Sequence, residues 1–388
     1  MIRLPPDFTL LQVIPELETG GAEQTTLDVA RAVIEAGGRA IVASRGGRMA
    51  ARLAADGAVL KPLPVQSKNP FVMLANAARL ARLIRTEHVS LVHARSRAPA
   101  FSALWAAKAT GVPYLATYHG VYNAKTGLKR WYNGIMTRGV ITIANSNYTR
   151  ERVIAEHGLA GDKVVAIARG VDLSRFDPAK VAPDRITALR EAWKIAPSDE
   201  RVKVILAGRL TRWKGQRLLI DAAARLNAEG ETNFLILLVG DDQGRSAYRR
   251  ELETAIEDAG LVETVRLVGH CDDMPAAYLL ADLACAPSVD PEPFGRTAVE
   301  PQVMGRPVLA ADHGAARETV DAGKTGWLVE PGDPAAWARA LKDAIAAGPK
   351  RRRAMGAAAM ARARELYSVD AMCEATLNVY ARLLDGRG

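Results

Sequence analysis

At 388 residues the chain is too long for one ordinary hydrophobic core, and its length is typical of two domains. Hydrophobic residues make up 49% of the sequence and charged residues 24%, a balance that excludes an intrinsically disordered chain. The cysteines Cys271, Cys285 and Cys373 have no Cys-x-x-Cys spacing, which argues against a structural zinc site and fits a reducing, cytoplasmic compartment.

The net charge of +9 is distributed unevenly along the sequence. Residues 1–180 hold 24 Lys and Arg against 13 Asp and Glu, whereas the remainder holds 28 against 30. A basic half favours contact with a phosphate-bearing small molecule, an anionic lipid or a nucleic acid, and ordinary solvation of helix faces is the alternative. Because no run of about 18 uncharged apolar residues occurs, we expect no membrane-spanning helix, and Pro5, Pro6 and Asp7 argue against a signal peptide.

Short apolar runs alternate with helical stretches, a pattern typical of βα units on a parallel sheet. In the first half, strands are predicted at 9–15, 40–43, 59–62, 91–93, 114–117, 140–144 and 164–167, with helices at 22–36 and 71–87. Pro178, Pro183 and Pro197 then mark a connector around 175–200. Further strands are predicted at 202–207, 234–239, 265–268, 283–286, 308–310 and 327–329, followed by helices only over 335–384. The sequence therefore predicts two doubly wound α/β domains in tandem.

In such sheets ligands bind outside the carboxyl ends of the strands, so the loops after the strands carry the chemistry. Gly20 and Gly21 follow the first strand and precede a helix. Paired glycines let the backbone approach a ligand, and a helix N-terminus attracts anions, although a plain tight turn explains the glycines equally well. The segment is not Gly-x-Gly-x-x-Gly, which argues against a dinucleotide oxidoreductase.

Two further loops combine cations and carboxylates. Arg209 and Lys214 follow the first strand of the second half, where they can neutralise a diphosphate and stabilise it as it leaves; solvated surface cations are the alternative. Glu292 and Glu300 bracket a Pro-Phe-Gly turn and the start of a helix near Thr297, whose amides can meet phosphate. One carboxylate can accept hydrogen bonds from sugar hydroxyls and the other from ribose hydroxyls.

Arg209, Lys214 and the segment E-P-F-G-R-T-A-V-E at 292–300 resemble the retaining glycosyltransferases of family four, which have the GT-B fold. Further matches cover nearly the whole chain: GGAE at 20–23, YHG at 118–120, NS at 145–146, GVD at 170–172, VGD at 239–241 and GRPV at 305–308. The resemblance implies two Rossmann-like domains facing across a cleft. It implies an acceptor-side domain over 1–178, a donor-binding domain over 179–365, and a helix over 366–388 that packs back on the N-terminal domain.

The resemblance also implies a role for each matching residue on a nucleotide-diphosphate sugar. In the N-terminal domain, Gly20 and Gly21 would meet the donor phosphate through their backbone, and His119 would hydrogen-bond the donor sugar. In the second domain the implied catalytic residues are Arg209 and Lys214 on the diphosphate and Glu292 on the sugar. Backbone amides of Phe294 and Gly295 would lie near the sugar, and Glu300 would bind the ribose.

The implied reaction is a metal-independent transfer that retains the anomeric configuration. No residue stands out as a covalent nucleophile, so the route is front-side attack with the leaving diphosphate stabilised by cations and helix amides. The pairs Asp241-Asp242 and Asp272-Asp273 are adjacent rather than spaced, so no divalent metal and no other cofactor are expected. Two positions depart from the family pattern: Pro301, which lacks an amide donor and is expected to bend or end its helix early, and Arg169 in place of a frequent asparagine.

The acceptor is expected to be a glycan or a lipid-linked glycan. Residues 92–99 and 119–123 resemble bacterial lipopolysaccharide-core glycosyltransferases. Basic residues with interleaved aromatic side chains at 71–85 and 124–138 suit an anionic membrane surface, and they also suit an acceptor that carries phosphate. Peripheral attachment to the inner face of the cell membrane is expected, and a packed helix with a basic face is the alternative. A nucleotide-sugar epimerase and a catalytically silent sugar-nucleotide binder remain open. Nucleic acid is not expected as a partner, because no recognised binding motif appears.

Overall fold

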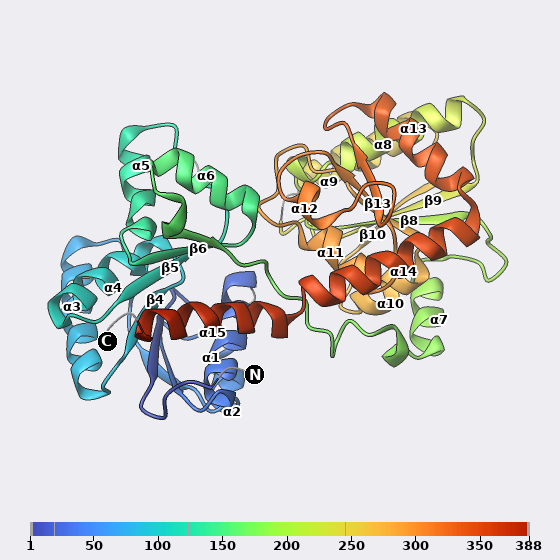
Figure 1. Ribbon diagram of the computed structural model, residues 1–388. Helices are drawn as coiled ribbons and strands as arrows, with labels where there is room; N and C mark the ends of the chain where they lie inside the picture. Colours follow the sequence, from blue (N-terminus) through green and yellow to red (C-terminus); the bar gives the residue numbers. More distant parts are fainter. Residues whose placement is uncertain (1–2, 19, 123, 245, 386–388) are drawn as a thin grey trace. The chain divides into compact units, whose positions relative to one another are not determined.

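The computed structural model describes residues 3–18, 20–122, 124–244 and 246–385 (Figure 1). Asn123, which belongs to one of the segments with a family resemblance, lies outside the described residues. Contacts between Cα atoms divide the chain into two compact units, one of residues 1–170 with 369–388 and one of residues 171–368. The chain therefore leaves the first unit after Gly170 and returns to it at Val369.

The first unit is built on a seven-stranded parallel sheet with the strand order β3-β2-β1-β4-β5-β6-β7. Its strands are β1 (Thr9–Val13), β2 (Arg39–Ser44), β3 (Val59–Pro62), β4 (Leu91–Ala94), β5 (Tyr114–Tyr118), β6 (Ile141–Ala144) and β7 (Val164–Ala166). Its helices before the end of the chain are α1 (Gly21–Glu35), α2 (Ala50–Ala55), α3 (Pro70–Thr86), α4 (Arg97–Thr110), α5 (Gly127–Asn133) and α6 (Asn147–His157), with short 3-10 turns η1 (Gly134–Thr137) and η2 (Gly161–Lys163). All residues of β1, β4 and β5 are buried, as a sheet covered by helices on both faces requires.

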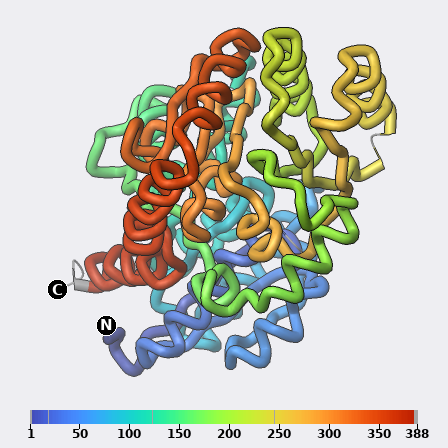
Figure 2. Tube along the Cα trace, turned by 90° about the vertical axis from the view of Figure 1, so that its right-hand side faces the viewer, coloured from blue at the N-terminus to red at the C-terminus, as the bar shows by residue number. Residues whose placement is uncertain are grey.

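The last helix, α15 (Val369–Asp385), belongs to the core of the first unit. It packs beside α1, and Tyr380 is fully buried with Phe8 and Leu10 (Figure 1). The Tyr380 hydroxyl lies 2.6 Å from Nδ1 of His93 on β4. Leu383 packs against the same cluster as Leu4, and α15 is the red helix nearest the C label in Figure 2. A helix from the end of the sequence thus completes the core that the first strand begins.

The second unit holds a six-stranded parallel sheet with the order β10-β9-β8-β11-β12-β13. Its strands are β8 (Val202–Ala207), β9 (Phe234–Val239), β10 (Val265–Gly269), β11 (Leu283–Ala286), β12 (Val308–Ala311) and β13 (Gly326–Val329). Its helices are α7 (Pro183–Ala192), α8 (Gln216–Ala228), α9 (Ser246–Asp258), α10 (Met274–Leu280), α11 (Arg296–Val303), α12 (Ala316–Thr319), α13 (Pro334–Ala346) and α14 (Gly348–Leu366), with 3-10 turns η3 (Pro178–Lys180) and η4 (Arg212–Lys214). Trp337 of α13 is fully buried in the core on one face of this sheet.

The predicted strands are all present, most of them within one residue of their expected ends, and the α/β fold class with two parallel sheets and C-terminal helices is confirmed. The stretch 175–200 is more ordered than a plain connector, because it contains α7. Pro183 occupies the first position of that helix, where its missing N–H costs nothing. Pro301 lies inside α11, which continues for two residues and ends at Val303. The proline therefore stands near the end of a short helix rather than at a break.

Candidate functional site

A buried ion pair joins two loops at the carboxyl edge of the second sheet. Lys214 ends the 3-10 turn after β8, and Glu292 stands on the loop after β11. Lys214 Nζ lies 2.7 Å from Glu292 Oε1, and both side chains are largely buried. The Ser288 hydroxyl donates a hydrogen bond to the same carboxylate oxygen. The structure therefore brings together two of the predicted catalytic residues, 78 positions apart in the sequence.

Close backbone packing explains why these two loops meet. Gly215 has φ +78°, and a Cβ atom added there would lie 2.0 Å from the carbonyl oxygen of Pro287. A residue with a side chain is therefore excluded at this position both by the left-handed conformation and by the approach of the β11 loop. On the other side, Ala315 N donates to the carbonyl oxygen of Glu292, so the loop after β12 also supports the Glu292 loop.

Arg209 lies at the same sheet edge, but unlike Lys214 it is not paired with a carboxylate of the described residues. Its side chain is exposed, and no described residue forms an ion pair or side-chain hydrogen bond with its guanidinium. Its carbonyl oxygen accepts a hydrogen bond from Gln216 Nε2 of α8 at 2.9 Å, which fixes the backbone of the loop. By contrast Arg212, three residues later, is paired with Glu251 at 2.6 Å. The backbone of Arg209 is thus fixed, while its guanidinium is available to bind an anion.

Glu300 is held within its own helix. Arg296 Nη2 lies 2.8 Å from Glu300 Oε1, and the Tyr278 hydroxyl donates to Glu300 Oε2 at 3.1 Å. Burial raises the pKa of the Tyr278 hydroxyl well above its ordinary value, so it remains a donor. A carboxylate offers about four lone-pair positions, which leaves Glu300 able to accept further bonds. The predicted turn before this helix also forms: Phe294 is buried against Tyr367, and Gly295 caps α11 at φ +80°.

One candidate residue, His313, escaped the sequence analysis. It follows β12, and it lines a small cavity together with Ser288 and Glu292. Both ring nitrogens of His313 are buried, and neither has a hydrogen-bond partner within the described part of the chain. A His-Gly pair directly after a buried strand was the only available signal, and it is too common to single out a site. Buried polar atoms without partners mark a place where a bound group would complete the hydrogen bonding.

In the first unit the predicted residues lie at the carboxyl ends of β1 and β5. Gly20 caps α1 in an extended conformation, and no side chain caps the helix, so its first amides can meet an anion. Gly21 begins α1. His119 directly follows β5, and both its ring nitrogens are buried without a partner among the described residues. Burial, followed by the charges of Arg169 and Arg95, holds the pKa of His119 well below its ordinary value. His119 is therefore a neutral imidazole.

Two arginines gather around His119. Arg169, the departure from the family pattern, donates from Nη2 to the carbonyl oxygen of His119 at 3.1 Å. Arg95 follows β4 and is almost completely buried, with its Nε donating to Gln12 Oε1 at 2.7 Å. Sequence reasoning gave neither a role, because their proximity depends on the order of β1, β4, β5 and β7 in the sheet.

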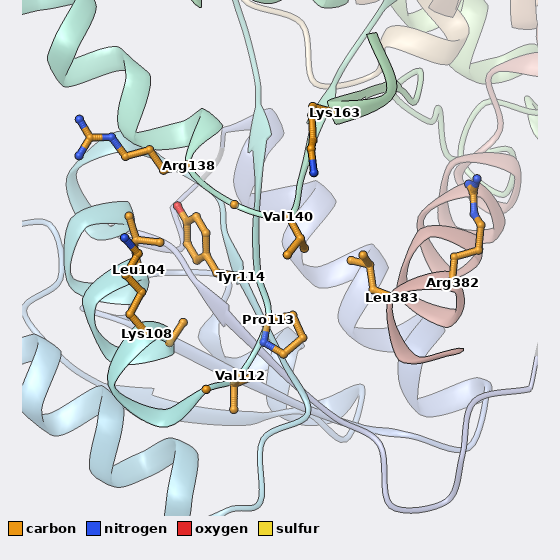
Figure 3. A pocket seen from close by; sticks show the side chains of 13 residues that line it. Leu104, Lys108, Val112, Pro113, Tyr114, Arg138, Val140, Lys163, Arg382 and Leu383 are labelled. Atoms are coloured by element: carbon orange, nitrogen blue, oxygen red, sulfur yellow. The ribbon is translucent and has the colours of Figure 1, made fainter. Parts of the chain in front are cut away.

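A large open pocket of the first unit lies at the other edge of its sheet. It is lined by the segments that precede β5, β6 and β7, including Pro113, Val140 and Lys163, and by Leu383 of α15 (Figure 3). Because the predicted site residues follow the strands rather than precede them, this pocket is separate from the candidate site. Within the described residues, no group of three or more His, Cys, Asp or Glu side chains is arranged to hold a metal ion.

Residues 189–362 match a family model described as glycosyl transferases group 1, and residues 19–175 match one described as glycosyltransferase family 4. D-inositol 3-phosphate glycosyltransferase 1 of Catenulispora acidiphila is 31% identical over 298 residues, which cover 72% of this chain and 69% of the relative. The chain spans about half the length of the first curated relatives that it matches, which are likewise D-inositol 3-phosphate glycosyltransferases.

Among solved structures, a glycosyltransferase of Rickettsia africae is 32% identical, with a TM-score of 0.89 and coverage of 97% of this chain and 98% of that one. The Anabaena protein HepE in complex with UDP-glucose is 25% identical, with a TM-score of 0.80 and coverage of 96% and 99%. These similarities assign the two-sheet architecture to the GT-B fold.

Proposed function

Because this chain belongs to the family 4, group 1 glycosyltransferases, we propose that it moves a hexose-type sugar from a nucleotide-diphosphate donor to a glycan or lipid-linked acceptor, with retention of configuration. The observation that carries the proposal is the arrangement at the carboxyl edge of the second sheet. There the Lys214–Glu292 pair is buried, and the Arg209 guanidinium has no protein partner among the described residues. Cations at this edge can stabilise a diphosphate, and the carboxylate beside them can accept hydrogen bonds from the hydroxyls of a pyranose.

The chemistry follows from charge development. The bond between the anomeric carbon and the diphosphate oxygen breaks, and the diphosphate gains negative charge that Arg209 and Lys214 stabilise. The acceptor oxygen forms its bond to the anomeric carbon on the same face, and the acceptor proton passes to the leaving diphosphate. In this scheme Glu292 accepts hydrogen bonds from sugar hydroxyls, and backbone amides of Phe294 and Gly295 lie near the sugar.

The remaining predicted residues take binding roles in the proposal. Glu300, oriented by Arg296 and Tyr278, accepts from the ribose hydroxyls with its remaining lone pairs. In the first unit, Gly20 and Gly21 meet the donor phosphate through the uncapped start of α1. His119 is neutral, so it binds a sugar hydroxyl as a hydrogen-bonding imidazole rather than as a cation.

A uridine donor is the first to test, because HepE is described in complex with UDP and UDP-glucose. We propose a place in lipopolysaccharide or other cell-envelope glycan synthesis, which rests on the resemblance of residues 92–99 and 119–123. The inositol phosphate in the names of the curated relatives makes a phosphorylated cyclitol a second candidate acceptor.

We further propose that the enzyme works at the inner face of the cell membrane. No helix among the described residues is long and apolar enough to cross a membrane. Apolar side chains are exposed at the start of α3 and on α5. Phe71 of α3 is 82% exposed, and Leu128 and Trp131 of α5 are 76% and 53% exposed. Both helices lie against α4. The Ser102 hydroxyl of α4 donates a hydrogen bond to the carbonyl oxygen of Met73 on α3, and the ring of Phe101 on α4 lies 5.7 Å from that of Trp131 on α5. Apolar side chains beside lysines and arginines suit an anionic bilayer.

The test is thermal stabilisation by a panel of nucleoside diphosphates and sugar nucleotides in metal-free buffer. We expect a rise in Tm with one nucleobase, and a smaller rise in Glu300→Ala. Glu253→Ala is the matched control, because Glu253 forms the same kind of i,i+4 pair with Arg249 on α9. No shift of Tm with any nucleotide at millimolar concentration would refute the donor assignment, and so would an equal loss in both variants.

A further inference from the structure

A second cavity of the first unit opens at the carboxyl edge of its sheet, and none of the predicted site residues lines it. The cavity has a volume of about 630 Å³. It is bounded by Pro15 after β1, by Ser96 after β4 and by Val121 after β5, strands that are neighbours in the sheet. This edge is where ligands bind in sheets of this type, and the volume suits a small polar ligand such as a monosaccharide or disaccharide.

The lining of this cavity is positively charged. Lys68, Arg97 and Lys129 all line it, and no Asp or Glu does so among the described residues. None of the three cations forms an ion pair with a described residue. Arg97 also occupies the first position of α4, at the end of the helix where the backbone dipole already favours an anion. Three like charges without a counter-charge leave the cavity poised for an anionic group.

Arg97 is held in place by neutral groups. Its Nη1 donates to Asn133 Oδ1 at 2.8 Å, and its guanidinium carbon lies 3.8 Å from the ring centroid of Tyr122. A guanidinium stacked on an aromatic ring and anchored by an amide keeps its remaining N–H groups in a fixed direction. The cost of ordering this cation is thus met by the fold, before a ligand arrives.

The cavity also offers groups that suit a sugar ring. Tyr122 and Tyr132 both line it, and the Tyr122 ring is already packed against Arg97 and the ring of Tyr118. Gln66 Oε1 is buried and has no hydrogen-bond partner within the described residues, so it can accept from a ligand hydroxyl. The lining therefore combines cations for an anionic group with an amide and the Tyr132 side chain for a polyhydroxylated ring.

We propose that this cavity is the acceptor site and that it selects a sugar or cyclitol carrying a phosphate, bound by Lys68, Arg97 and Lys129. The proposal rests on the proposed transferase function and adds to it the chemical class of the acceptor. The phosphate meets the three cations, and the ring lies against Tyr132 with a hydroxyl donating to Gln66.

The experiment is isothermal titration of the full chain with glucose 6-phosphate and inositol 1-phosphate, each against its unphosphorylated form and against inorganic phosphate. At least one phosphorylated probe is expected to bind tenfold or more tightly than both comparators. The double substitution Lys68→Gln and Lys129→Gln should weaken that binding roughly tenfold, as expected for two partly exposed charge pairs. Both lysines are exposed, so the variant should fold as the wild type does.

The matched control is Lys108→Gln with Lys163→Gln, which removes two lysines from the pocket at the other edge of the sheet (Figure 3). Equal weakening in this control would overturn the proposal, and so would equal affinity for phosphorylated and unphosphorylated probes. Inorganic phosphate that binds as tightly as the sugar phosphates would reduce the cavity to a plain anion site, which also overturns it. Nucleotide binding is measured on the same samples. If nucleotides bind and the phosphorylated probes do not, the acceptor proposal fails while the transferase assignment stands.

Discussion

A buried lysine ammonium needs a counter-charge, and Lys214 finds one in Glu292. The pair is 2.7 Å apart, and the side chains are only 10% and 14% exposed. Removing one member would leave the other uncompensated, so a loss of activity in Lys214 or Glu292 variants would mix chemistry with stability. Arg209 is the better probe of the proposed diphosphate site, because it is exposed and its side chain has no partner among the described residues.

We therefore predict that Arg209→Gln lowers the rate at which the sugar nucleotide is cleaved about 10²- to 10³-fold. The loss of one preorganised hydrogen-bond donor to a developing charge has an effect of this size. The Tm should stay unchanged, since no contact is lost. Arg212→Gln serves as the control, because Arg212 stands on the same loop but is already paired with Glu251. If both variants lose activity alike, Arg209 has no special role.

His119 makes a prediction about pH. Its pKa is well below the ordinary value in the folded protein, chiefly through burial, whereas the unfolded chain takes a proton near pH 6.5. Below that pH the unfolded state binds more protons than the folded state, so the free energy of unfolding falls as the pH falls. His119→Asn should flatten this decline between pH 6 and 5 by up to about 1.4 kcal/mol per pH unit. Urea unfolding at several pH values measures it, and an unchanged slope would contradict a neutral buried imidazole.

At the scale of elements, the part of the candidate site in the second unit depends on how closely the loops after β8, β11 and β12 pack together. Gly215 shows this dependence most directly, because its missing side chain lets the loop after β8 touch the carbonyl of Pro287. Glycine at a left-handed position is common where a helix ends, but at Gly215 an added Cβ atom would also lie 2.0 Å from this carbonyl oxygen.

We predict that Gly215→Ala lowers the free energy of unfolding more than Gly230→Ala. Gly230 has a similar φ of +81° but open space around an added Cβ atom, so its substitution should cost only the left-handed strain, roughly 1–2 kcal/mol. Gly215→Ala adds a clash with backbone and should also weaken nucleotide binding, since Lys214 is the preceding residue. Urea denaturation with a nucleotide titration checks both effects, and equal losses would show that the loop can yield.

At the scale of the whole molecule, the positive charge is concentrated in residues 1–180, where 24 basic residues face 13 acidic ones. Exposed apolar residues of α3 and α5 lie within that part of the chain. A polybasic surface with apolar side chains binds anionic bilayers through both charge and insertion, and only the charge contribution is screened by salt.

We predict that the protein floats with anionic vesicles at low salt and less so at high salt. Leu128→Gln with Trp131→Gln should reduce flotation at both, because these side chains are 76% and 53% exposed on α5. Val262→Gln is the control, since Val262 is 58% exposed but lies in the second unit. No binding to anionic vesicles at either salt concentration would refute the membrane proposal.

The sequence by itself determined the class of fold and the family. Strands of a parallel sheet are buried on both faces, so they appear in the sequence as short apolar runs. Stretches with helical spacing separate these runs, and β1 to β13 could therefore be located without coordinates. The E-P-F-G-R-T-A-V-E segment pointed to a glycosyltransferase because its glycine and carboxylates are close in sequence. Pro183 was misleading as a sign of a loop, since a proline at the first helical position starts α7.

Only the tertiary structure decided which residues share a site. Lys214 meets Glu292 across 78 residues, Arg169 reaches His119 across 50, and Tyr380 meets His93 across 287. Such contacts depend on the order of strands in the sheet and on which loops become neighbours at its edge. Local periodicity carries no information about either, because a strand has the same apolar pattern wherever it is inserted in the sheet.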